Sequence, residues 1–289
     1  MHRSGTSVVT GVLDRLGLDG GPRDLMLDGD RFNADGYWEQ RPLVELHRAI
    51  LRRERGFASA PPKEPMWYSA RSRELAARGI DQVLSVFADR PWFLKDPAHC
   101  LLLDLWDDHR GLGDLAVVVS RAPRHVARSL RHRNRYSEAM ALGLWERYSR
   151  ATLGNLAGRA CHFVRYEDLL EDPHGTVADL AATLNEVFGM DLGPEIVTHA
   201  AELVRPSDRA SSSSATAVAN APLAREQSEL DEILTGLRGY HRRFGGVVLP
   251  APSSVGVRAL ERRRRLLLLA TSVVTLDLDR SARLDRRGR

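Results

Sequence analysis

The sequence predicts an α/β fold built on a central parallel sheet. Three short apolar runs, at residues 92–94, 115–119 and 162–164, are typical of buried parallel strands. Helical patterns lie between and around these runs, at residues 6–16, 40–54, 71–88, 98–108, 123–133, 137–157, 175–188 and 225–243. Strands that alternate with helices predict a sheet covered on both faces, with the functional site at the carboxyl ends of the strands.

Composition supports a folded intracellular protein. The chain has 289 residues, of which 43% are hydrophobic and 28% charged, so wholesale disorder and fibrous repeats are excluded. Cys100 and Cys161 are too few for a disulfide scaffold, and no zinc-ligand spacing surrounds them, so both are expected to be reduced thiols. No apolar run reaches the roughly 18 residues of a membrane span, and Gly11 and Asp14 interrupt the only segment that faintly resembles a signal peptide. We therefore expect a cytoplasmic protein.

The net charge of +4 is distributed unevenly along the chain. Residues 250–289 contain ten arginines and four acidic residues, whereas residues 1–249 have a balance of −2. The basic character therefore belongs to a tail, which we expect to be weakly ordered. Residues 205–224 are rich in Ser, Ala and Pro and have no apolar period, which predicts a mobile loop.

A short polar loop at residues 2–7 runs directly into the first helical pattern. Such a loop presents unpaired backbone N–H groups and the positive end of the helix dipole, an arrangement that holds phosphate. The loop is no Walker A motif, because the Gly-Lys pair is absent and Arg3 supplies the cation. The structural alternative is a polar amino terminus whose Ser and Thr side chains only cap the helix.

Arg121 follows the predicted strand 115–119, and Ser129 lies eight residues later on the following helix. A guanidinium and a hydroxyl in this arrangement can hold one anion together. The alternative is an arginine-rich helix with no role beyond its solvated surface.

Two further polar positions stand next to predicted elements. Lys95 follows the predicted strand 92–94, and the adjacent Asp96 either orients Lys95 or caps the next helix. Glu39 precedes the helical pattern 40–54 and acts either as a general base or only as a favourable charge at a helix start.

Taken in order, these segments resemble the sulfotransferases that use 3′-phosphoadenosine 5′-phosphosulfate (PAPS), particularly the bacterial type with a His-Arg-Ser-Gly-Thr-Ser loop. The resemblance covers residues 1 to about 170. Its landmarks are the loop at 2–7, Gly-Tyr-Trp-Glu at 36–39, Leu-Lys-Asp-Pro at 94–97, Arg121-x-Pro with Ser129, and Tyr-Glu-Asp-Leu-Leu at 166–170 followed by Asp-Pro at 172–173.

The resemblance implies a P-loop-like three-layer fold in residues 1–249 and in-line transfer of a sulfuryl group from PAPS to an acceptor hydroxyl or, less readily, an amine. Glu39 would be the base, and Arg3 and Lys95 would stabilise the transferred group and the leaving oxygen. The acceptor would be a small molecule, a glycan or a lipid, and no metal or specific nucleic acid is expected. The 5′-phosphate would be held by Arg3, Ser4, Gly5, Thr6 and Ser7, and the 3′-phosphate by Arg121 and Ser129.

One departure concerns the sheet. In the family a central strand precedes the phosphosulfate loop, whereas this sequence begins inside the loop, so the first strand is expected to be missing; we favour a start codon assigned too late. Two other functions stay open: a P-loop nucleotide kinase, which the missing Gly-Lys pair disfavours, and a non-catalytic nucleotide- or polyanion-binding protein.

Overall fold

A small mixed sheet lies at the centre of the molecule. The computed structural model describes residues 3–29, 36–87, 90–110, 113–205 and 222–284, with the backbone alone for 110 and 270–284. In this part of the chain the strands are β1 (Ala116–Ser120), β2 (Cys161–Arg165) and β3 (Gly239–His241), in the order β1-β2-β3. β1 and β2 are parallel, and β3 pairs antiparallel with β2. The predicted α/β class is confirmed, and no strand precedes the first helix within the described residues.

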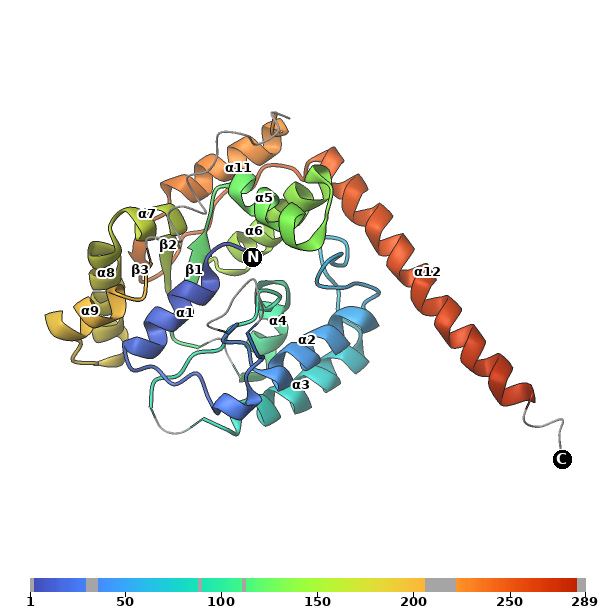
Figure 1. The fold of residues 1–289 in the computed structure, drawn as a ribbon, viewed down its shortest axis with the longest axis horizontal. Helices are drawn as coiled ribbons and strands as arrows, with labels where there is room; N and C mark the ends of the chain where they lie inside the picture. Colours follow the sequence, from blue (N-terminus) through green and yellow to red (C-terminus); the bar gives the residue numbers. More distant parts are fainter. Residues whose placement is uncertain (1–2, 30–35, 88–89, 111–112, 206–221, 285–289) are drawn as a thin grey trace.

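Helices make up most of the fold, and most begin and end near the predicted positions (Figure 1). The described part contains α1 (Thr6–Arg15), α2 (Arg41–Arg53), α3 (Ala70–Leu84), α4 (His99–Arg110), α5 (Pro123–Asn134), α6 (Glu138–Asn155), α7 (Tyr166–Glu171), α8 (Pro173–Phe188), α9 (Pro194–Ala201), α11 (Arg225–Gly236) and α12 (Ser254–Leu284). Side chains fix several of these starts: Ser69, Ser137 and Asp172 accept hydrogen bonds from the first turns of α3, α6 and α8.

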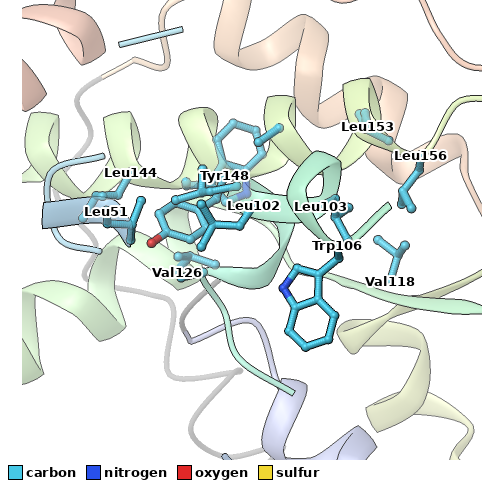
Figure 2. Close-up of a cluster of buried hydrophobic side chains, with 14 of the residues drawn as sticks. Leu51, Leu102, Leu103, Trp106, Val118, Val126, Leu144, Tyr148, Leu153 and Leu156 are labelled. Atoms are coloured by element: carbon cyan, nitrogen blue, oxygen red, sulfur yellow. The ribbon is translucent and has the colours of Figure 1, made fainter. Parts of the chain in front are cut away.

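The alternation of side chains along the strands divides the core between two clusters. Val118 and Phe163 belong to a cluster with residues of α2 to α6, and Figure 2 shows Val118 there with Trp106 and Tyr148. Val117, Val119 and Val164 belong to or pack against a second cluster formed with α1, α7, α8 and α9. The sheet is therefore covered by helices on both faces, which places the strand ends, and the loops that follow them, between the two groups of helices.

The predicted strand at residues 92–94 does not form. Trp92 makes only an isolated parallel bridge with Asp19, in which the N–H of Asp19 donates to Pro91 and the N–H of Phe93 donates to Asp19. The opposing segment contains Gly17, Gly20, Gly21 and Pro22, which are poor residues for a continuous ladder. Lys95 nevertheless follows an extended segment, as predicted.

The carboxyl-terminal third contains one difference from the expected pattern of helices. The helix predicted over 225–243 ends at Gly236, because Gly239, with φ +61°, turns the chain back to form β3 along β2. The basic tail begins with α12, whose first turns pack against α6 (Figure 1). Gly143 and Gly256 allow this approach, since a Cβ on Gly143 would lie 2.9 Å from the Gly256 Cα.

The predicted mobile loop at 205–224 lies almost wholly outside the described residues.

In the described part of the chain, no helix has the length and apolar character needed to cross a membrane.

Candidate functional site

The loop that precedes α1 is held in a backbone conformation that a helix cap does not explain. Arg3 and Gly5 both have positive φ, +67° and +88°, and Ser4 is buried with 2% of its surface exposed. Gly5 is the N-cap residue of α1, and no side chain supplies a capping hydrogen bond there. The alternative in which Ser and Thr side chains serve only as caps is therefore wrong for this helix. The loop joins a positive helix end to the basic side chain of Arg3.

The loop lies beside the turn that follows β1. The Arg3 Nε donates a hydrogen bond of 2.7 Å to the Ser129 Oγ on α5, and the Arg121 guanidinium donates one of 3.2 Å to the Arg3 carbonyl. The Trp145 indole N–H donates to the Arg121 carbonyl at 3.2 Å, which fixes the backbone after the strand. Arg3, Arg121 and Ser129, predicted from separate stretches of sequence, thus meet at one place.

Tyr166, the first residue after β2, packs against both the loop and Arg121. Tyr166 is 5% exposed, and the Arg121 guanidinium lies 4.7 Å from the centroid of its ring. A Cβ on Gly5 would lie 2.0 Å from the Tyr166 Cδ2, so only glycine fits against this face. The sequence predicts the packing of Tyr166 at a strand end but not its contact with the loop.

Glu167 ties together the segments that follow the two parallel strands. Its Oε1 accepts hydrogen bonds from the Ala122 N–H at 3.1 Å and from the His125 Nδ1 at 3.2 Å. Burial raises the pKa of this carboxyl, but the hydrogen bonds from His125 and Ala122 and the nearby Arg165 charge outweigh burial and leave the pKa below its usual value. The ionised carboxylate holds the turn that carries Arg121.

Lys95 and Glu39 form an ion pair on the other side of the loop. The Lys95 Nζ lies 2.5 Å from the Glu39 Oε1, 2.9 Å from the Tyr37 carbonyl and 3.5 Å from the Ser7 Oγ. Both side chains are largely buried, with 9% and 12% exposed. Burial raises the pKa of Glu39, and the Lys95 charge opposes this shift only in part. Glu39 is therefore a more basic carboxylate than an exposed one.

Asp96 has the structural role that one of the two alternatives predicts. Its Oδ1 accepts from the Ala98 N–H at 3.0 Å, just before α4, and its Oδ2 lies 2.7 Å from the His47 Nδ1. The Trp106 indole N–H donates to the His47 Nε2, so that Nδ1 carries the proton donated to Asp96. This buried chain fixes the backbone next to Lys95.

One cavity of about 940 Å³ connects these groups. Arg3, Gly5, Thr6, Ser7 and Arg121 line it together with Glu39 and Lys95. Ser4 and Ser129 are not among its lining residues, but Ser129 is only half-buried and its hydroxyl contacts the lining residue Arg3. Seven basic side chains and two carboxylates border the cavity, a balance suited to a multiply charged anion.

Several lining residues were not predicted. Arg133 donates a 2.6 Å hydrogen bond to the Tyr37 hydroxyl and lies 5.1 Å from the Tyr37 ring centroid. Arg41, Arg48 and Arg52 border the cavity from α2, and their spacing of seven and four residues is the signal that places them on one face of that helix.

No metal site is apparent among the described residues, where no three His, Cys, Asp or Glu side chains are grouped to hold an ion. His162 instead shares a 2.8 Å hydrogen bond with the Thr183 hydroxyl, and His125 contacts Glu167. Protein-family models, curated proteins and solved structures were compared with this chain, and none of them matches it.

Proposed function

We propose that the protein is a PAPS-dependent sulfotransferase with a P-loop-like arrangement of its α/β core. The observation that carries the proposal is the hydrogen bond from Arg3 to Ser129, together with the shared cavity that Arg3, Arg121, Glu39 and Lys95 border. A hydrogen bond joins two segments, far apart in the sequence, to which we assign the binding of anions. A ligand with two phosphate-like ends fits such an arrangement better than a ligand with one.

The donor would be held at both of its anionic ends. The 3–7 loop, at the positive end of α1, would take the 5′-phosphosulfate through the backbone of Ser4 to Thr6 and the hydroxyls of Thr6 and Ser7. Arg121 and Ser129 would take the 3′-phosphate, which distinguishes this nucleotide from ADP and ATP. Arg3 belongs to the loop and contacts Ser129 of the proposed 3′-phosphate site. It would stabilise the charge that grows on the departing 5′-phosphate oxygen.

Transfer breaks the bond between the sulfur and the 5′-phosphate oxygen and forms a bond from sulfur to the acceptor oxygen. Glu39 would accept the hydroxyl proton, and adenosine 3′,5′-bisphosphate would leave with the electron pair of the broken bond. The sulfuryl oxygens would compete with Glu39 for the Lys95 ammonium, so donor binding would leave the carboxylate available to the acceptor. The raised pKa of Glu39 favours this role, since a more basic carboxylate is a better proton acceptor.

Thermal unfolding with different nucleotides tests the proposal. Adenosine 3′,5′-bisphosphate at 1 mM is expected to raise the midpoint temperature well above the value with 1 mM ADP, with no need for magnesium. Equal protection by both nucleotides would remove the reason for assigning Arg121 and Ser129 to a 3′-phosphate, and protection by ATP only with magnesium would favour a kinase. Selective binding without transfer to any of a broad panel of hydroxyl and amine acceptors would favour the non-catalytic alternative.

A further inference from the structure

Helix α2 presents a row of arginines to the cavity. Arg41, Arg48 and Arg52 all line it and are exposed. Steps of seven and four residues return to nearly the same side of an α-helix, so the three guanidinium groups follow one stripe. The stripe extends about 16 Å along the helix at 1.5 Å per residue.

These arginines have no acidic partner in the described part of the chain. None of the three forms an ion pair there, whereas Lys95 is paired with Glu39. Of the two carboxylates that line the cavity, Glu39 is already paired with Lys95, which leaves Asp28. Glu45 is exposed on the same stripe of α2, between Arg41 and Arg48, but it does not line the cavity, so the lining as a whole keeps an excess of positive charge. Three like charges on one wall repel one another, and an anion bound between them would relieve that repulsion.

The position of the stripe assigns it to the acceptor side. Glu39 stands two residues before the start of α2, so the stripe begins next to the Glu39 backbone and runs along the helix beside the cavity. The Arg48 charge still acts on Glu39, where it is one of the influences that lower the pKa of that carboxyl. The groups that we assign to the nucleotide come instead from the 3–7 loop, the turn after β1 and α5.

We therefore propose, on the basis of the sulfotransferase function above, that the acceptor is an anion: its hydroxyl lies at Glu39 while a carboxylate, sulfate or phosphate of the same molecule is held by Arg48 and Arg52. Neutral alcohols of the same shape would bind more weakly, because they leave the guanidinium groups without a counter-charge. This selects acidic sugars or other anionic metabolites over neutral hydroxyl compounds.

Two matched sugars test the charge requirement. 4-Nitrophenyl β-D-glucuronide and 4-nitrophenyl β-D-xyloside offer the same ring hydroxyls and differ in the carboxylate. Calorimetric titration of the full chain, both alone and saturated with adenosine 3′,5′-bisphosphate, is expected to give at least tenfold tighter binding of the glucuronide at low salt. The difference should shrink as sodium chloride is raised. Equal affinities, or no detectable glucuronide binding, would overturn the proposal.

A double substitution tests whether Arg48 and Arg52 cause the preference for the glucuronide. Arg48→Gln combined with Arg52→Gln is expected to bring the two sugars to within about twofold of each other while leaving the affinity for adenosine 3′,5′-bisphosphate unchanged. Arg53→Gln is the control, because Arg53 is exposed on the same helix but does not line the cavity. If the double variant still prefers the glucuronide, the carboxylate is not held by Arg48 and Arg52.

The design separates the two proposals. If the bisphosphate fails to bind but the glucuronide preference depends on Arg48 and Arg52, the anion site stands and the sulfotransferase proposal fails. If the bisphosphate binds selectively and the sugars do not differ, the acceptor proposal alone fails.

Discussion

Arg3 and Ser129 are 126 residues apart in sequence, and the Arg3 Nε donates a 2.7 Å hydrogen bond to the Ser129 hydroxyl. The contact joins the loop before α1 to α5, whose start is set by the turn that carries Arg121. A ligand held by one segment would therefore also be positioned by the other. This coupling explains why nucleotide selectivity should be sensitive to a single hydroxyl.

Replacing Ser129 by Ala is expected to weaken adenosine 3′,5′-bisphosphate about tenfold or more while changing ADP affinity little. A hydrogen bond to a charged group contributes about 1.5–3 kcal/mol, and only the bisphosphate has the 3′-phosphate that the hydroxyl would hold. Calorimetric titration of both nucleotides measures the selectivity. Ser129→Thr keeps the hydroxyl and should keep most of the preference. A parallel loss of both affinities in Ser129→Ala would mean that Ser129 acts only by holding Arg3.

The sequence predicts the local parts of this site better than their arrangement. Loop chemistry and helix periodicity depend on neighbouring residues, so the polar loop at 3–7, the helix that follows and the strand before Arg121 could all be identified. The contact of Tyr166 with Gly5 and the stripe on α2 depend on how elements pack, which no local pattern encodes. The predicted strand at 92–94 does not form because the segment that lies opposite it is rich in glycine, and which segment would lie there depends on packing that the local pattern at 92–94 does not encode.

Glu39→Gln is expected to reduce turnover by about 100- to 10,000-fold with little change in donor binding, because the amide can still accept a hydrogen bond from Lys95 but takes no proton. A radiolabelled transfer assay measures turnover, and titration with adenosine 3′,5′-bisphosphate checks donor binding. Full turnover in Glu39→Gln would require a different base. A large loss of donor affinity would instead show that the ion pair organises the loop.

The turnover of the native protein should fall at low pH over a range set by Glu39. Burial raises the pKa of this carboxyl, and the proton-accepting form is the ionised one. Activity is therefore expected to be lost as pH falls through a midpoint above the ordinary glutamate value, and to be retained above it. The measurement is kcat against pH with donor and acceptor saturating. An acid limb that persists unchanged in the residual activity of Glu39→Gln would belong to another group.

Gly5→Ala is expected to abolish selective binding of adenosine 3′,5′-bisphosphate. The added methyl group would lie 2.0 Å from the Tyr166 ring, so either the loop or the ring must move. Gly17→Ala is the matched control: Gly17 also has positive φ, +93°, but its nearest neighbour would be 4.0 Å away, at the Met190 methyl group. The control should lose roughly 1 kcal/mol of stability through backbone strain and keep its nucleotide binding. If the two variants bind adenosine 3′,5′-bisphosphate equally well, the contact with Tyr166 does not determine the conformation of the loop.

Ser253→Ala is expected to destabilise the fold, because Ser253 anchors the start of α12 on a buried carboxylate. Its backbone N–H and its hydroxyl both donate to Glu146 at 2.5 Å, and Gln227 donates to the same carboxylate at 2.9 Å. Glu146 and Ser253 have 4% and 0% of their surfaces exposed, so water does not readily replace the lost hydroxyl. Leaving a buried acceptor without one of its donors costs about 1–3 kcal/mol, which urea unfolding measures as a lower midpoint. Ser254→Ala makes the same change one residue later at an exposed position and should leave the midpoint nearly unchanged. Coincident unfolding curves for the two variants would show that this contact does not stabilise the junction between α6 and α12.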